Sequence, residues 1–201
     1  MKTVPTLTLT DGLQMPEILS DLMDTEVHVT ELLSGIEWAA TITRYSDLPG
    51  HIQVFEGGEL VSESRILYDQ RIDFFLDDFL RLAPKEVEHV ILRGVLLDSF
   101  EYGLGSDQVR FFDIELNGEP VGPLGAFAVF QSWGLLAVPV LSIPGQTLYQ
   151  WLNRRSPEKA ARGSSRLYAR ERRGVVIRPT EELNHPEIGR LVVKLEANPS
   201  N

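Results

Sequence analysis

The stretch RGVVIRP (Arg173–Pro179), followed by GRLVVK (Gly189–Lys194), decides the fold of this chain. A glycine followed by three β-branched residues predicts a strand that is buried on both faces. The proline ends that strand, because it has no N–H to donate to a neighbouring strand. The second stretch also predicts a strand, so Arg178 and Lys194 each place a cation near a strand end. Two such cations could hold an anionic ligand such as a nucleotide; the alternative is a core hairpin with solvated ends.

Composition narrows the class of protein. The chain has 201 residues, 43% of them hydrophobic and 24% charged, which is typical of a globular protein. Cysteine is absent from the sequence, which excludes disulfides, zinc–thiolate sites and thiol nucleophiles. The four histidines lack the spacing of metal ligands, so no metal site is predicted. No apolar run approaches the roughly 20 residues that span a bilayer, and no secretory leader is recognisable, so we expect a cytoplasmic protein without a membrane partner.

Charge is distributed unevenly along the chain. The formal net charge of −10 argues against a general nucleic-acid binder, because phosphate contacts require clustered cations. Residues 1–150 carry 8 Lys and Arg against 23 Asp and Glu, whereas residues 151–178 carry 9 against 2. Residues 151–178 therefore form either an anion-binding surface or a solvated basic segment that balances an acidic body.

Residue patterns predict an α+β protein rich in antiparallel strands, because strands and helices do not alternate regularly. The clearest helix is residues 66–82, where apolar residues recur every three or four positions and Pro84 ends the pattern. Asn117-Gly118 predicts a hairpin turn. The other expected elements are two strands within 25–43, joined at 33–36, strands at 51–55, 87–97, 108–116 and 138–143, helices at 126–134 and 145–155, and a mobile connection at 157–165.

Five short motifs occur in a fixed order along the chain. They are VTELLSG (Val29–Gly35), SESR (Ser62–Arg65), VILRGVLL (Val90–Leu97), RFFDIELNG (Arg110–Gly118), and RGVVIRP with GRLVVK. Together they resemble the adenylating domain of the RNA ligase family over about residues 25–196. The resemblance implies one nucleotidyltransferase domain over residues 1–201, of the ATP-grasp-related fold, with antiparallel sheets around a central cleft and flanking helices. It also requires residues 29–42 to lie close to Arg178 and Lys194.

The resemblance implies a specific chemistry. In that family a lysine amine attacks the α-phosphate of ATP, carboxylates hold a metal ion, an aromatic ring stacks on adenine, and cations bind phosphate oxygens. Three positions depart from this pattern. Leu32 stands in place of the nucleophilic lysine, Val95 in place of the ribose-binding glutamate, and Arg173 in place of a metal-binding glutamate. Leucine has no lone pair, so these degenerate positions predict no catalytic residue and no cofactor.

Other parts of the implied site are retained. The candidates for nucleotide or phosphate binding are Arg65, Phe112 (or Phe111 in the other register of the strand), Arg178 and Lys194. We expect Arg173 to stand near Arg178 and Lys194, so that the former metal position could accept a phosphate without magnesium. Alternatively, a carboxylate from residues 1–150 neutralises Arg173 and fills the cleft.

Three functional hypotheses remain open. The first is an RNA-ligase-like protein without adenylyltransferase activity, retained for binding RNA, a nucleotide or a protein partner through residues 151–178. Its candidate RNA contacts are Arg166, Arg170 and Arg172. The second is an active RNA ligase that uses ATP and magnesium and has a relocated nucleophile, Lys85 or Lys194. The third is a structural or assembly protein with a filled cleft.

Overall fold

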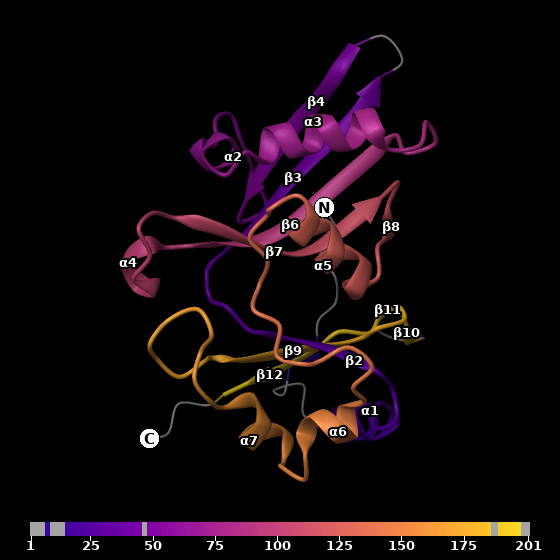
Figure 1. Cartoon of the computed structure of the whole chain (residues 1–201), viewed down its shortest axis with the longest axis vertical. Coiled ribbons are helices and arrows are strands. Elements are labelled where there is room, and N and C mark those ends of the chain that lie inside the picture. The colour runs from indigo at the N-terminus through magenta and orange to yellow at the C-terminus, as the bar shows by residue number, and fades with distance from the viewer. Residues whose placement is uncertain (1–6, 9–14, 46–47, 186–188, 198–201) are drawn as a thin grey trace. The chain divides into compact units, whose positions relative to one another are not determined.

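The computed structural model describes residues 7–8, 15–45, 48–185 and 189–197. Most of residues 1–14, namely 1–6 and 9–14, therefore lies outside the described residues. The chain divides into two compact units (Figure 1). Unit 1 comprises residues 1–33, 122–124 and 138–201, and unit 2 comprises residues 34–121 and 125–137. The single domain expected over residues 1–201 stays a prediction.

Unit 2 contains a six-stranded antiparallel sheet in the order β5-β4-β3-β6-β7-β8. Its strands are β3 (Ile36–Tyr45), β4 (Leu48–Glu56), β5 (Glu59–Val61), β6 (His89–Leu97), β7 (Gln108–Leu116) and β8 (Glu119–Pro120). The predicted turn at Asn117-Gly118 is confirmed, with φ angles of 53° and 85° that suit a tight hairpin. A short helix that the sequence analysis missed, α4 (Ser99–Tyr102), follows β6 and begins where the Asp98 carboxylate accepts from the Glu101 N–H.

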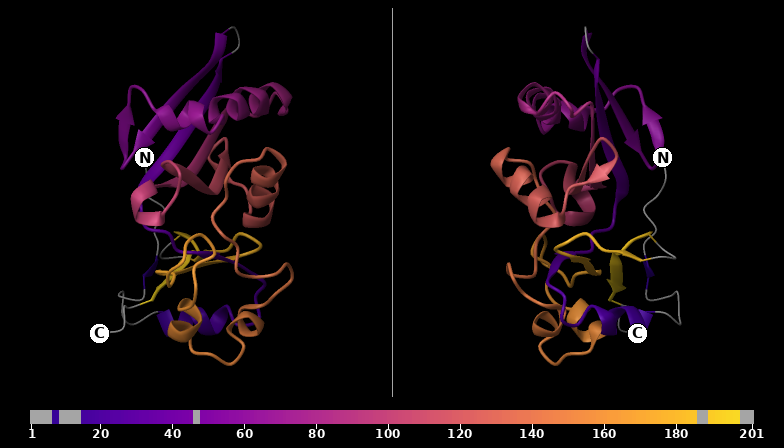
Figure 2. Two further views of the ribbon diagram at one scale, coloured as in Figure 1. Left: turned by 60° about the vertical axis from the view of Figure 1, so that its left-hand side comes forward. Right: turned by 90° about the vertical axis from the view of Figure 1, so that its right-hand side faces the viewer.

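One face of this sheet is covered by helices. Helices α3 (Ile72–Leu82) and α5 (Pro123–Ser132) lie on the same side of the sheet (Figure 2). The buried side chains of the sheet meet those of the helices in an aromatic cluster: Trp38 contacts Phe111 edge-on with 5.9 Å between ring centroids, and Phe111 lies 5.7 Å from Phe130. This burial of aromatic and aliphatic area is the main stabilising term of unit 2.

The predicted helix over 66–82 is wrong in one respect, because the chain forms two helices there. Helix α2 (Arg65–Asp69) ends at Gln70, and α3 begins after Arg71, which has a left-handed backbone with φ 55°. The Gln70 amide donates to the Val109 carbonyl at 3.3 Å and its oxygen accepts from the Val109 N–H at 2.6 Å. This contact with β7 fixes the chain where the helix breaks. The spacing of apolar residues along the sequence gives no sign of it.

Unit 1 contains a four-stranded sheet in the order β1-β12-β9-β2. Its strands are β1 (Leu7–Thr8), β2 (Val27–Glu31), β9 (Gly174–Pro179) and β12 (Val193–Glu196); β1 is parallel to β12 and the other pairs are antiparallel. A small hairpin pairs β10 (Asn184–His185) with β11 (Gly189–Arg190). Helices α1 (Met15–Asp21), α6 (Leu148–Leu152) and α7 (Pro157–Ala161) contribute to the apolar core against the sheet. None of the helices in the described ranges is long and apolar enough to cross a membrane.

Three expectations for residues 138–165 need correction. The strand expected at 138–143 is reduced to a single bridge between Thr30 and Val140, because Pro139 has no N–H for a continuous ladder. The helix expected at 145–155 is only α6; its start is well capped, since Thr147 and Gln150 form a reciprocal capping box. The connection expected to be mobile contains α7, whose first turn is capped by the Ser156 side chain.

Candidate functional site

The register of the unit 1 sheet collects polar side chains on one face. Thr30 lies opposite Val176, and Val176 lies opposite Lys194, so these three residues share a face. His28 lies opposite Arg178, two residues further along, and therefore belongs to the same face. The opposite face is apolar and forms the core of the unit. The requirement that the first motif lie beside the last is thus confirmed for its strand part, β2.

Burial gives this polar face unusual electrostatics. His28 is 7% exposed and Arg178 is 9% exposed, while Lys194 is half-buried. Burial, and secondly the positive charge of Arg178, lowers the pKa of His28 to about 4. At neutral pH the imidazole is therefore uncharged and the positive charge of the face comes from Arg178 and Lys194. Lys194 is the most exposed of these polar residues, because Thr30, like His28 and Arg178, is buried.

Glycines of two motifs are explained by close packing. A Cβ on Gly174, which has φ +150°, would lie 2.2 Å from the Leu195 carbonyl oxygen. A Cβ on Gly35 would lie 2.3 Å from the Leu96 carbonyl oxygen. Both distances are far shorter than a real contact, so only glycine fits without movement of the backbone. These glycines are therefore needed for strand packing, whether or not the chain retains any chemistry.

Leu32 is held at one end of the unit 1 sheet. It directly follows β2, its side chain is half-buried, and its N–H donates to the Gly174 carbonyl at 3.0 Å. Arg173 is at the same end, where its carbonyl accepts from the Ala197 N–H at 2.8 Å. Arg178 is five residues further along, roughly 16 Å at the rise of a strand. The expected grouping of Arg173 with Arg178 is therefore corrected: the strand separates them.

Glu31 is the buried carboxylate of this unit and was missed as a site residue. It is 1% exposed, and its Oε2 accepts from the Arg166 N–H at 2.9 Å. Its Oε1 has no hydrogen-bond partner. Burial lowers the pKa of Arg172, and the negative charge of Glu31 offsets part of that effect. Glu31 thus holds the backbone of the basic segment at Arg166, and its charge acts on Arg172.

The remaining ligase-derived candidates are in unit 2. Arg65 is the exposed first residue of α2, and Val95 lies opposite Arg110 on β6 and β7. The pairing of β6 with β7 shifts where Arg93 faces Asp113 but Gly94 faces Phe111, so Phe112 is the extra residue of a bulge. Of the two aromatic candidates, Phe111 is a core residue, whereas Phe112 is half-buried and lies outside the regular ladder. That position is compatible with a stacking role.

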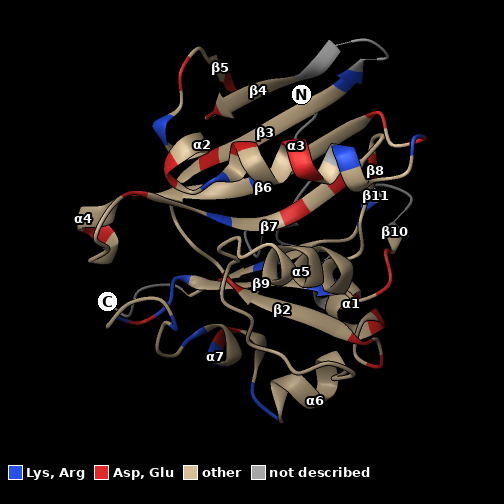
Figure 3. Ribbon diagram, turned by 45° about the horizontal axis from the view of Figure 1, so that its top comes forward, with Lys and Arg blue, Asp and Glu red and all other residues tan. Residues whose placement is uncertain are grey.

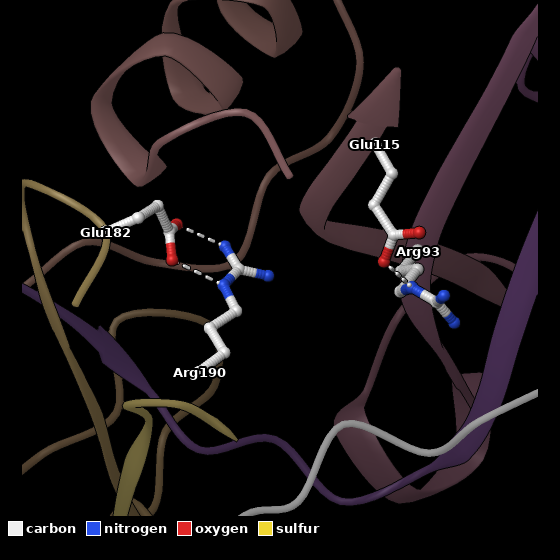
Figure 4. Close-up of polar contacts among 4 residues, drawn as sticks. All are labelled: Arg93, Glu115, Glu182 and Arg190. Carbon is white, nitrogen blue, oxygen red and sulfur yellow. Dashed lines mark hydrogen bonds and ion pairs between the residues drawn. The ribbon is translucent and has the colours of Figure 1, made fainter. Parts of the chain in front are cut away.

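A buried ion pair in unit 2 was not foreseen. The Arg93 Nε donates to Glu115 Oε1 at 2.9 Å, and the two side chains are 8% and 13% exposed (Figure 4). Asp113, only 1% exposed, is opposite Arg93 in the register. The signal in sequence was an arginine inside the apolar run VILRGVLL. In unit 1, Arg190 makes a second, bidentate pair with Glu182 at 2.5 and 2.7 Å, also drawn in Figure 4.

The side chains of some arginines of residues 151–173 donate hydrogen bonds to backbone carbonyls, whereas that of Arg170 donates to none in the described part of the chain. Figure 3 shows their positive charges distributed around α7 and the chain that leads to β9. Arg155 donates to the carbonyls of Trp151 and Leu152, Arg166 to that of Val140, and Arg172 to those of Ala160, Ala161 and Arg162. Two of the three candidate RNA contacts, Arg166 and Arg172, therefore also cap backbone groups. Arg170 is exposed and makes no side-chain hydrogen bond or ion pair among the described residues.

A metal ion of the kind that the resemblance implies needs several carboxylate or imidazole side chains around it. Among the described residues there is no group of three or more His, Asp or Glu side chains that could hold a metal ion. Arg173 stands at the start of β9, where the resemblance places a metal-binding carboxylate, and a guanidinium cannot coordinate a cation. The residues described at this end of the unit 1 sheet therefore do not fit a catalytic metal.

Comparison with known proteins identifies the fold. No protein-family model and no curated protein matches the chain. Among solved structures, the Naegleria gruberi RNA ligase with pyrophosphate gives a TM-score of 0.65 at 17% identity, covering 90% of this chain and 52% of the ligase chain. A lysine-to-alanine mutant of that ligase with ATP and Mn gives 0.66 at 18%, covering 92% and 53%. The chain is therefore a mixed α/β protein with antiparallel sheets and an RNA-ligase-like fold, and it spans about half the length of those ligases.

Proposed function

We propose that this chain is an RNA-ligase-like protein that does not form a lysyl-adenylate and that binds RNA. The observation that carries the proposal is Leu32, whose backbone is held beside Gly174 where the resemblance places the nucleophile. An aliphatic side chain cannot attack a phosphate, and no rotamer changes that. Val95 and Arg173 remove two further groups that the reaction needs. We assign the domain to the ATP-grasp-related nucleotidyltransferase fold and expect it in the cytoplasm.

Ligand binding is the activity that the remaining residues favour. Arg178 and Lys194, with Thr30, give the unit 1 sheet a cationic face on which a phosphate group of RNA or of a nucleotide could bind. Arg65 and Phe112 stay candidates for phosphate and base contacts in unit 2. The basic segment 151–173 supplies further positive charge outside this face. RNA is the ligand that would use both regions of positive charge.

The proposal is tested by incubating the purified protein with α-labelled ATP and either magnesium or manganese. We expect no covalent AMP adduct, while the Naegleria gruberi RNA ligase labels in the same experiment. A labelled band at the mass of this chain would overturn the proposal. The same preparation, titrated into a fluorescent single-stranded RNA at low salt, is expected to bind with an affinity that falls steeply as salt rises.

The second hypothesis is an active ligase with a relocated lysine. One observation favours Lys194 for this role, because its side chain shares a face with Thr30 and Arg178. Lys85 precedes β6 at the His89 end, whereas Gly35 packs on Leu96 at the other end, roughly 23 Å away along the strand. If label appears, mass spectrometry of the adduct and the variants Lys194→Ala and Lys85→Ala will identify the nucleophile. An assembly role remains if neither label nor RNA binding is found.

A further inference from the structure

A strained arginine follows helix α6. Asn153 and Arg154 both have left-handed backbones, with φ angles of 47° and 63°. Asparagine tolerates this conformation, but for arginine it brings the Cβ too close to the following carbonyl. A glycine at position 154 would relieve the strain at no cost in contacts. Arg154 is also exposed, so burial of its side chain does not offset this strain.

The neighbouring cations differ in how they are engaged. Arg155 and Arg172 donate to backbone carbonyls at the ends of α6 and α7. By contrast, the side chains of Arg154, Lys159 and Arg170 are exposed and make no hydrogen bond or ion pair with any described residue. These three cations are therefore available to an external anion.

The three cations precede, belong to and follow one short helix, α7. Ser156 caps α7 two residues after Arg154, and Lys159 is in the middle of α7. The Arg172 guanidinium ties the following loop to the end of α7 through Ala160 and Ala161, at 2.9 Å each, and Arg170 is two residues away. Because α7 has five residues and is about 7.5 Å long, Arg154 and Lys159 lie close together along the chain, and Arg172 brings the loop that carries Arg170 to the end of this helix.

An exposed aromatic ring adjoins this area. Tyr149 of α6 is 59% exposed, and its carbonyl accepts from the Asn153 N–H, which places it one helical turn before Arg154. Exposed rings beside unpaired cations are the features that bind single-stranded nucleic acid, since bases stack on the ring while cations contact phosphates. An acidic protein would use the cations but would gain little from the ring.

We propose that Tyr149, Arg154, Lys159 and Arg170 form a contact surface for single-stranded RNA. This surface deepens the proposed function and rests on it, because RNA binding by the chain is itself the proposal above. It replaces Arg166 and Arg172 as principal RNA contacts, since their guanidinium groups already serve the fold.

The test compares two glycine variants by fluorescence anisotropy with a labelled 12-nucleotide oligouridylate. Arg154→Gly relieves left-handed strain and removes one charge; Arg71→Gly does the same at the start of α3 in unit 2. Both variants are expected to raise the melting temperature by at most about 2–4 °C, because relief of the left-handed strain is partly offset by the greater freedom of glycine in the unfolded chain. Only Arg154→Gly is expected to weaken RNA binding, by about five- to tenfold, and to reduce the slope of log affinity against log salt by about 0.7.

A third variant, Tyr149→Ala, examines stacking. We expect about a fivefold or greater loss of affinity for the oligonucleotide without a change in the salt slope. Equal affinity for a double-stranded RNA of the same length, or equally effective displacement by polyglutamate, would overturn the single-stranded RNA assignment. Wild-type binding that Arg154→Gly leaves unchanged defeats this surface alone. Absence of any salt-dependent binding by the wild type defeats the proposed function as well.

Discussion

His28 is the residue whose protonation most directly reports on the polar face of unit 1. Its pKa is lowered to about 4 by burial and by Arg178, against 6.5 in an unfolded chain. Between these two pH values the unfolded chain binds a proton that the folded chain does not, so acid favours unfolding. The stability is fully present above pH 6.5 and is lost as pH falls toward 4.

We therefore predict that stability falls by up to about 3 kcal/mol between pH 6.5 and pH 4 because of this one residue. Urea unfolding of the wild type and of His28→Gln at several pH values measures the effect, since carboxylates that titrate in the same range contribute equally to both proteins. A difference between the two proteins that does not change with pH would contradict the assignment.

The Arg93–Glu115 ion pair makes a second prediction at the residue scale. Arg93→Ala leaves the buried Glu115 carboxylate without its partner, and we expect a loss of about 3–5 kcal/mol in the free energy of unfolding. The control is Arg81→Ala, because the Arg81–Asp78 pair is shorter at 2.7 Å but its side chains are 72% and 44% exposed. We expect at most about 0.5 kcal/mol there. Equal losses in the two variants would show that burial does not set the strength of these pairs.

At the scale of elements, local patterns predicted the strands well. Alternation and β-branched runs gave β2, β3, β6, β7 and β9, and the Asn117-Gly118 turn was recognised from its dipeptide. These features depend on neighbours in sequence, so a pattern can register them. The connection between β2 and β3 was expected at residues 33–36 and is found at residues 32–35.

Elements that depend on distant contacts were not predictable. The break at Gln70–Arg71 follows a contact with Val109, which is far away in sequence. Helix α7 is held at its end by Arg172, eleven residues beyond its last turn. In the candidate site, the contacts of Arg166 and Arg172 with backbone carbonyls were not predictable for the same reason, because those carbonyls meet them only in the folded chain.

At the scale of the whole molecule, the proposed loss of catalysis predicts what would restore it. Leu32→Lys alone is expected to give no AMP adduct, because the carboxylates that the resemblance assigns to metal and ribose binding would still be absent. The triple variant Leu32→Lys, Val95→Glu, Arg173→Glu is expected to label with α-labelled ATP and manganese. A triple variant that folds, judged by its circular dichroism spectrum, but never labels would mean that these positions do not correspond to the ligase site.

The two uses of arginine around α7 have a consequence for how this chain behaves as a polyelectrolyte. The number of charges that the chain can offer to a polyanion depends on the guanidinium groups that face solvent. Several basic side chains of residues 151–178 instead donate hydrogen bonds to backbone carbonyls. A lysine cannot reproduce that forked geometry. Exchange of arginine for lysine at Arg155 or Arg172 therefore preserves formal charge while loosening the scaffold that presents the remaining cations.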